Sequence, residues 1–228
     1  MKLLFIRHGH PDYEHDCLTE RGRKEAEALA KRLTGMEIDA AFTSPMGRAK
    51  ETALFFTALS GIRVEERDWL HEFDVKINDA ESGGRKEAWD ISPKIWTRNR
   101  ELYDLELKSQ PEFIGTDYVA RAQAAAEGID ELLKGFGLVR EGRAYRRTGE
   151  SDKTVALFCH FGATCVALAH LLNIPPMVAL NSFSAEPTAI ATVCSDDRFG
   201  ETVNFRLHGY GDISHLGITA AGGTVDYK

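Results

Sequence analysis

Two short apolar runs that each end in a histidine place the strongest constraint on how this chain can fold. The first covers Leu3 to Ile6 and stops at Arg7-His8-Gly9, and the second covers Thr154 to Cys159 and is followed by His160. Runs of this kind are typical of strands buried in a sheet. Ligands of open α/β sheets bind beyond the carboxyl ends of the strands, so both histidines are predicted to lie where a binding site is expected.

The segments after the first run predict helices that alternate with strands. A helix is expected from about Thr19, with Gly35 ending it, because apolar residues recur at helical spacing, at Ala26, Leu29, Ala30 and Leu33. A second strand, Ile38 to Thr43, precedes Ser44-Pro45, which is typical of an N-cap with proline at the first helical position. We therefore predict an α/β fold with a mostly parallel central sheet and helices on both faces.

The middle of the chain, from about residue 74 to residue 147, predicts a helical insertion that acts as a lid. It is rich in charge, Ser92-Pro93 starts one helix, and Thr116 to Leu133 predicts another. No linker rich in Pro, Gly or Ser sets this part off, so residues 1–228 are interpreted as a single domain. Two later runs, Thr188 to Cys194 and Val203 to Leu207, predict a closing hairpin around Asp196-Asp197.

The charge balance argues against two classes of partner. The chain has 28 basic and 35 acidic side chains, a formal net charge of −7, so neither nucleic acid nor an anionic membrane surface is expected as the main partner.

The apolar run at the N-terminus is too short for a signal peptide, and no later run reaches membrane-spanning length. The four cysteines lack metal-ligand spacing. We expect a cytoplasmic protein with reduced cysteines, and the sequence does not indicate its oligomeric state.

The residues around the two histidines suit phosphoryl transfer. Arg7 and Arg48, which lies in the first turn of the helix after the second strand, can each hold phosphate oxygens with paired donors. The helix after His160 would direct free N–H groups at the same anion. An imidazole is a good nucleophile near neutral pH. The acid that protonates the leaving oxygen is predicted to be Glu72, flanked by Trp69 and Phe73, with Asp74 as the second choice.

Four segments in this order resemble the histidine phosphatase superfamily, which is phosphoglycerate mutase-like. They are Arg7-His8-Gly9, Leu18-Thr19-Glu20-Arg21-Gly22, the stretch from Ser44 to Ala53, and Cys159-His160-Phe161-Gly162; Asp212-Ile213-Ser214-His215-Leu216 is similar to the family's C-terminal segment. The resemblance implies that His8 is phosphorylated, that Arg7, Arg48 and His160 complete the phosphate pocket, and that Glu72 donates the proton. It implies that the protein needs no metal and no other cofactor. It also implies a phosphatase that acts on a small phosphorylated metabolite. Gly9 and His10 are expected to contact the substrate.

Several residues depart from the pattern of that family. His10-Pro11 stands where its phosphatases usually carry Glu-Thr, and Glu14 takes a place often held by asparagine near the phosphate. Phe161 replaces a small residue after the second histidine, and the Trp-Glu-Gly that often follows the acid is missing. These departures concern the residues that would face the substrate.

Other functions remain open at this point. A mutase of the same fold would retain the phosphoryl group and return it to the substrate, and a non-catalytic phosphate-binding module would keep only the pocket. A metallohydrolase is a further alternative, since His8-Gly9-His10-Pro11-Asp12-Tyr13 lacks one histidine of an HxHxDH metal-binding pattern. The basic cluster of Arg143, Arg146 and Arg147 is expected to be a solvated turn, or else to reach a second acidic group of the substrate.

Overall fold

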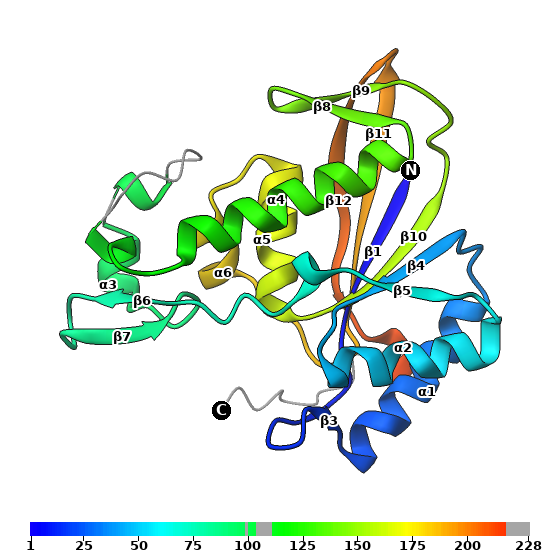
Figure 1. Ribbon diagram of the computed structural model, residues 1–228, viewed down its shortest axis with the longest axis horizontal. Helices are drawn as coiled ribbons and strands as arrows, with labels where there is room; N and C mark the ends of the chain where they lie inside the picture. The colour runs from blue at the N-terminus through cyan, green and yellow to red at the C-terminus, as the bar shows by residue number, and fades with distance from the viewer. Residues whose placement is uncertain (99, 104–110, 218–228) are drawn as a thin grey trace.

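An eight-stranded sheet runs through the centre of the computed structural model, which describes residues 1–98, 100–103 and 111–217 (Figure 1). The strand order is β5–β4–β10–β1–β11–β12–β9–β8. Its parallel half consists of β1 (Lys2–Arg7), β10 (Thr154–Cys159), β4 (Ala40–Thr43) and β5 (Val64–Glu66). Because Arg7 pairs with Cys159, the two histidine-terminated strands end side by side.

The other half of the sheet is antiparallel. It consists of β11 (Ile190–Phe199), β12 (Thr202–Asp212), β9 (Ala144–Arg147) and β8 (Leu138–Glu141). Within the described ranges, three strand pairings of this sheet are parallel and four are antiparallel, so the sheet is mixed rather than mostly parallel. The predicted α/β class is confirmed.

Two hairpins account for the difference. The β8–β9 hairpin turns at Gly142, which has a left-handed backbone with φ of 60°, in a basic region that the sequence had assigned to the insertion. The predicted closing hairpin is β11–β12, but Asp196 lies within its ladder, opposite Asn204. The turn lies farther on, near Gly200, where φ is 72° and glycine has no steric penalty.

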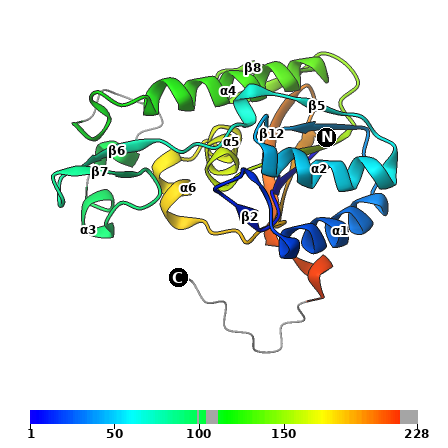
Figure 2. The ribbon, with the colours of Figure 1, turned by 60° about the horizontal axis from the view of Figure 1, so that its bottom comes forward.

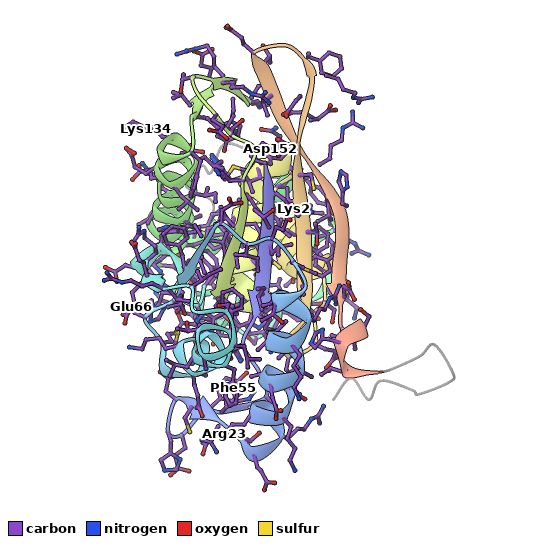
Figure 3. The ribbon with its side chains drawn as sticks, turned by 90° about the vertical axis from the view of Figure 1, so that its right-hand side faces the viewer. Lys2, Arg23, Phe55, Glu66, Lys134 and Asp152 are labelled. Atoms are coloured by element: carbon purple, nitrogen blue, oxygen red, sulfur yellow. The ribbon has the colours of Figure 1, made fainter. Side chains whose placement is uncertain are left out.

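Helices cover both faces of the sheet, as predicted. Alternate side chains of β1 point to opposite faces: Leu3 and Phe5 pack with α4 (Tyr118–Gly135) and α5 (Phe161–Leu172). Leu4 and Ile6 pack with α1 (Glu20–Thr34) and α2 (Gly47–Ser60) (Figure 2). In Figure 3, Lys2 and Asp152, near the amino ends of β1 and β10, lie in the upper part of the molecule, and Arg23 of α1 lies at the bottom.

The starts of the first two helices show how local sequence positions the loops beside the sheet. Thr19 caps α1, because its side chain accepts a hydrogen bond from the amide of Gly22, and Gly35 follows the last turn, as predicted. Ser44 was expected to cap the next helix, but α2 begins at Gly47, with Met46 at the cap position. The Ser44 hydroxyl instead bonds the amide of Met46 and the ring of His160.

The middle of the chain contains a second hairpin that the sequence did not predict, in place of a purely helical insertion. The elements here are β6 (Lys76–Asp79), β7 (Gly84–Glu87), α3 (Pro93–Trp96) and the short 3-10 helices η2 (Arg100–Tyr103) and η3 (Pro111–Phe113). They enclose their own core, in which Phe73, Ile77 and Tyr118 pack against α5 and α6 (Pro176–Ser182). Part of the predicted insertion, residues 99 and 104–110, lies outside the described residues.

The remaining elements are short and lie around the carboxyl edge of the parallel strands. They are β2 (Pro11–Asp12) paired with β3 (Cys17–Leu18), and the 3-10 helices η1 (Asp68–Leu70) and η4 (Ser214–Leu216). In the part of the chain that the structure describes, no helix combines the length and the apolar character needed to cross a membrane.

Candidate active site

The two histidines predicted from the strand ends lie next to each other. The ring centroids of His8 and His160 are 5.1 Å apart, and both side chains are buried. The amide of His8 donates to the carbonyl of Cys159 at 3.0 Å, which continues the β1–β10 ladder by one residue. The adjacency therefore follows from the parallel register of the two strands.

Hydrogen bonding leaves the His8 ring with one free nitrogen. Nδ1 lies 2.8 Å from the carbonyl oxygen of Gly9; because that oxygen only accepts, Nδ1 carries the hydrogen and Nε2 keeps its lone pair. Burial, together with the guanidinium groups of Arg7 and Arg48, lowers the pKa of His8 from 6.5 to about 3. The imidazole is thus neutral and nucleophilic at physiological pH.

Gly9 provides close packing directly after His8. A Cβ at this position would lie 2.6 Å from the carbonyl oxygen of Gly22, which is closer than atoms can approach. The amide of Gly9 donates to the hydroxyl of Thr52 on α2 at 3.0 Å. These contacts fix the backbone immediately after His8.

Both predicted arginines lie beside the histidines, and each retains an unused donor. Arg48 donates from Nη1 to Asp16 Oδ1 at 2.7 Å, and Arg7 donates from Nη1 to the carbonyl of Ala185. The Nε atoms of Arg7 and Arg48 are buried and have no hydrogen-bond partner among the described residues. Buried N–H groups without a partner are costly, so the pair suits an anion with several oxygens.

Asp16 is a site residue that the sequence analysis missed. Its other carboxylate oxygen, Oδ2, accepts from the amide of Gly47 at 2.6 Å, and its backbone is left-handed, with φ of 47°. These bonds and the Arg48 charge hold the pKa of Asp16 below its usual range, against the opposing effect of burial. The sequence could have indicated Asp16, because aspartate is common in turns and tolerates a left-handed backbone.

His160 is oriented by Ser44, which the sequence had predicted to cap a helix. Its Nε2 lies 2.8 Å from the hydroxyl of Ser44, at the end of β4, and its Nδ1 is buried without a partner in the described structure. Burial holds the pKa of His160 well below the usual value, and His8 and Arg48 add to the effect. Two neutral imidazoles and two guanidinium groups therefore lie close together.

The predicted acid, Glu72, lies at the start of α5. Its Oε1 accepts hydrogen bonds from the amides of Phe73, at 2.8 Å, and Ala163, at 3.2 Å, yet burial outweighs both and raises the pKa. A Cβ on Gly162 would lie 2.8 Å from the same oxygen. The second choice, Asp74, is exposed and lies 3.3 Å from Arg121. The geometry therefore favours Glu72.

The residues that depart from the family pattern take different positions. The ring of His10 is directed at the start of α1, where Nδ1 lies 3.1 Å from the hydroxyl of Thr19. Glu14 is exposed. Phe161 packs edge-on against Trp89, with ring centroids 6.1 Å apart. Trp69, which was expected to shield Glu72, packs against Gly128 of α4 instead.

The basic cluster does not join the site. Arg146 pairs with Glu141 at 2.5 Å and Arg147 with Asp197 at 2.6 Å. Arg143 lines a cavity of about 550 Å³ beside Asn173, at the opposite end of α5 from His160. A helix of this length separates Arg143 from His160 by roughly 18 Å, which is too far for one small substrate to contact both Arg143 and His8.

Cys159 is shielded although it precedes His160. Burial raises the pKa of its thiol to about 12, and the hydroxyl of Thr164 lies 3.3 Å from the sulfur. A thiol in this environment is not nucleophilic at neutral pH. In the described ranges, no group of three or more His, Cys, Asp or Glu side chains is placed to hold a metal ion.

Comparison with known proteins shows the family and the fold to which the chain is similar. A model of the histidine phosphatase superfamily (branch 1) matches residues 3–206. The chain is 31% identical over 133 residues to a 2,3-bisphosphoglycerate-dependent phosphoglycerate mutase of Staphylococcus haemolyticus, a match that covers 49% of this chain and 54% of that protein. It is 29% identical over 83 residues to phosphoserine phosphatase 1 of Hydrogenobacter thermophilus, covering 32% of this chain and 39% of that protein. These matches span about half or less of each relative.

Solved structures share the fold over nearly the whole chain. The native structure of a mycobacterial glucosyl-3-phosphoglycerate phosphatase has a TM-score of 0.63 at 20% identity and covers 92% of this chain and 98% of its own. A phosphoserine phosphatase mutant from Entamoeba histolytica has a TM-score of 0.61 at 20% identity and covers 94% and 98%. The predicted phosphoglycerate mutase-like fold is confirmed.

Proposed function

Because the chain belongs to the histidine phosphatase superfamily (branch 1), we propose that it is a phosphomonoester hydrolase that forms a phosphohistidine on His8. The observation that carries the proposal is the pairing of a neutral, buried His8 ring with two arginines whose buried Nε donors are unused. A neutral nucleophile beside unpaired cationic donors suits attack on a phosphate dianion.

The first step transfers the phosphoryl group to the enzyme. The lone pair on Nε2 of His8 forms a bond to phosphorus while the bond to the leaving oxygen breaks. Glu72, whose protonated form burial favours by raising the pKa, gives its proton to that oxygen. Arg7, Arg48 and His160 hold the other three oxygens as charge moves onto them. The step ends with phosphohistidine and the Glu72 carboxylate.

The second step returns the enzyme to its starting state. The Glu72 carboxylate takes a proton from a water molecule, whose oxygen attacks phosphorus as the bond to His8 Nε2 breaks. Inorganic phosphate leaves, and Glu72 is protonated again. The hydrogen bond from Nδ1 of His8 to the Gly9 carbonyl persists through both steps and stabilises the charge that the ring acquires.

A small phosphorylated metabolite is the substrate class that we propose. The enclosed position of His8 and His160 and the aromatic pair of Trp89 and Phe161 beside them support a compact substrate. The names of the similar proteins, which refer to phosphoserine and to phosphoglycerate compounds, support the same class. We further propose a single catalytic domain that works without a metal in the cytoplasm, a location supported by four free cysteines.

A phosphoglycerate-type mutase is the second candidate, and the 31% identity to a mutase over 133 residues favours it. The two activities differ in the acceptor of the phosphoryl group, which is water in one case and a second hydroxyl of the substrate in the other. Rates of phosphate release and of transfer between phosphoglycerates, measured on the same preparation, separate them.

A phosphate-release screen over small phosphorylated metabolites tests the proposal. Wild-type protein should release phosphate from at least one of them and from p-nitrophenyl phosphate, with and without a chelator. His8→Ala should reduce the rate to background, whereas His15→Ala, a change at an exposed histidine, should not. Equal rates for wild type and His8→Ala would refute the mechanism, and loss of activity with the chelator would favour a metallohydrolase.

A further inference from the structure

His215 contacts a loop that is hydrogen-bonded to His8 and Arg7, although the proposed reaction assigns this histidine no part. β12 ends at Asp212, which pairs with Ile190 of β11. Ile190 in turn pairs with Ile6, two residues before the nucleophile. The following turn, η4, packs on α1, where Figure 2 shows it in red. Its His215 contacts Thr188 in the loop of residues 183–189.

Thr188, in that loop, has an unfavourable backbone conformation. Its φ is 60°, in the left-handed region, and its side chain is fully buried, at 0% exposure. The left-handed region is sterically unfavourable for a β-branched residue. Such a residue keeps this conformation only where its surroundings hold it there, and residues of this kind cluster at functional sites.

The loop that contains Thr188 holds two residues of the proposed reaction. The amide of Thr188 donates to the carbonyl of His8 at 3.1 Å, opposite the bond from the His8 amide to Cys159. The carbonyl of Ala185, three residues earlier, accepts the bond from the Arg7 guanidinium. The position of the nucleophile and the direction of one phosphate-binding arginine therefore both depend on this loop.

His215 is the side chain that holds Thr188. The Thr188 hydroxyl donates its single hydrogen to the carbonyl of Pro187 at 2.7 Å. The contact of 2.9 Å between His215 Nε2 and the same hydroxyl must therefore be a bond that the histidine donates. Nδ1 is then an acceptor, and it faces Nη1 of Arg32 at 3.4 Å.

Charges around His215 keep this arrangement in place. Burial and the Arg32 guanidinium lower the pKa of the His215 ring, which keeps it neutral with one donor and one acceptor. Arg32 also pairs with Asp212, whose Oδ1 accepts from the amide of Ser214. The chain of contacts thus runs without a gap from α1, through η4 and Thr188, to the backbone of His8.

We propose that His215 is a positioning residue for the nucleophile: its Nε2–H bond to Thr188 holds the loop that fixes the His8 carbonyl and the Arg7 guanidinium. The inference rests on the proposed function, since it concerns the same reaction. Without the bond, Thr188 relaxes toward negative φ and its amide turns away from the His8 carbonyl. The His8 ring is then less often aligned for Nε2 to attack phosphorus. The transition state is affected more than substrate binding, because Arg48 and His160 still hold the phosphate.

Steady-state kinetics with p-nitrophenyl phosphate tests this role. His215→Ala and His215→Leu, which lack the donor, should each lower kcat about tenfold, the effect of losing one hydrogen bond, and change KM by less than about twofold. His215→Gln should recover most of kcat, because its amide can donate at the place of Nε2. His208→Ala, at an exposed histidine of β12, is the matched control and should match wild type.

Thr188→Gly supplies a second test, because glycine adopts positive φ at no steric cost. If His215 acts by holding Thr188, then adding His215→Ala to Thr188→Gly should change kcat by less than about twofold, against about tenfold in the wild-type background. An equal loss in both backgrounds would overturn the inference, as would a fall in thermal stability with kcat unchanged. Inactivity of the wild type would instead contradict the proposed function.

Discussion

Glu72→Gln removes proton transfer by this side chain and keeps its shape. Glutamine has nearly the same shape, and its Oε1 can still accept from the amides of Phe73 and Ala163, at 2.8 and 3.2 Å in the wild type. The variant loses the proton for the leaving oxygen and, in the second step, the carboxylate that takes a proton from water. General acid catalysis contributes about 10²–10⁴-fold, which corresponds to about 3–5 kcal/mol of transition-state stabilisation. We expect this whole loss in kcat for an alkyl phosphate, whose leaving oxygen must be protonated.

The leaving group provides the assay. p-Nitrophenolate is stable as an anion, so Glu72→Gln should slow phosphoenzyme formation from p-nitrophenyl phosphate by less than about tenfold, measured as the burst of p-nitrophenol in rapid mixing. Asp74→Asn is the matched control, because Asp74 is exposed and pairs with Arg121, and it should match wild type on both substrates. Equal losses on the two substrates in Glu72→Gln would refute the assignment, and a selective loss in Asp74→Asn would move the role to Asp74.

Three further predictions concern the groups around the nucleophile. Since the pKa of His8 is lowered to about 3, nitrogen-15 NMR should show a neutral His8 ring as the pH falls through 6.5 and down to about 4; a midpoint near 6.5 would contradict the burial argument. Asp16→Ala should raise KM about tenfold with kcat less affected, because it frees Arg48 from its anchor at 2.7 Å, and an unchanged KM would show that Arg48 needs no anchor. Gly162→Ala should cost about 1–3 kcal/mol of unfolding free energy and lower kcat, because its Cβ would lie 2.8 Å from Glu72, 2.9 Å from Trp89 and 3.0 Å from Phe73; the control Gly135→Ala, which meets nothing within 4 Å, should not destabilise the protein in a thermal melt.

The sequence predicted best what local pattern alone determines. The runs that became β1 and β10 are apolar along their length because both faces of the strands are covered, and the 3.6-residue spacing of α1 reports one buried face. The adjacency of His8 and His160 followed from the rule that sites lie at the carboxyl ends of parallel strands. The roles assigned to Arg7, Arg48, Gly9, His10 and Glu72 stay predictions until they are measured.

Features that depend on distant partners were not predictable from local pattern. Strand β6 carries Lys76 and Asn78 on its open side and buries Ile77 against the middle helices, which gives too little apolar signal for a strand. Ser44 has the local signature of a helix cap, but the tertiary contact with His160 determines its position. Asp16 lies 32 residues before its partner Arg48, and His215 lies 27 residues after Thr188.

Direct detection of the phosphorylated residue tests the central claim. Wild-type protein mixed briefly with a phosphorylated substrate, quenched in alkali and digested should yield a peptide with one added phosphoryl group on His8, and acid should remove that group. His8→Ala should yield none, and Glu72→Gln should still form the group from p-nitrophenyl phosphate. A phosphoryl group on another residue, or rapid phosphate release by wild type without any modified peptide at the earliest mixing times, would contradict the account.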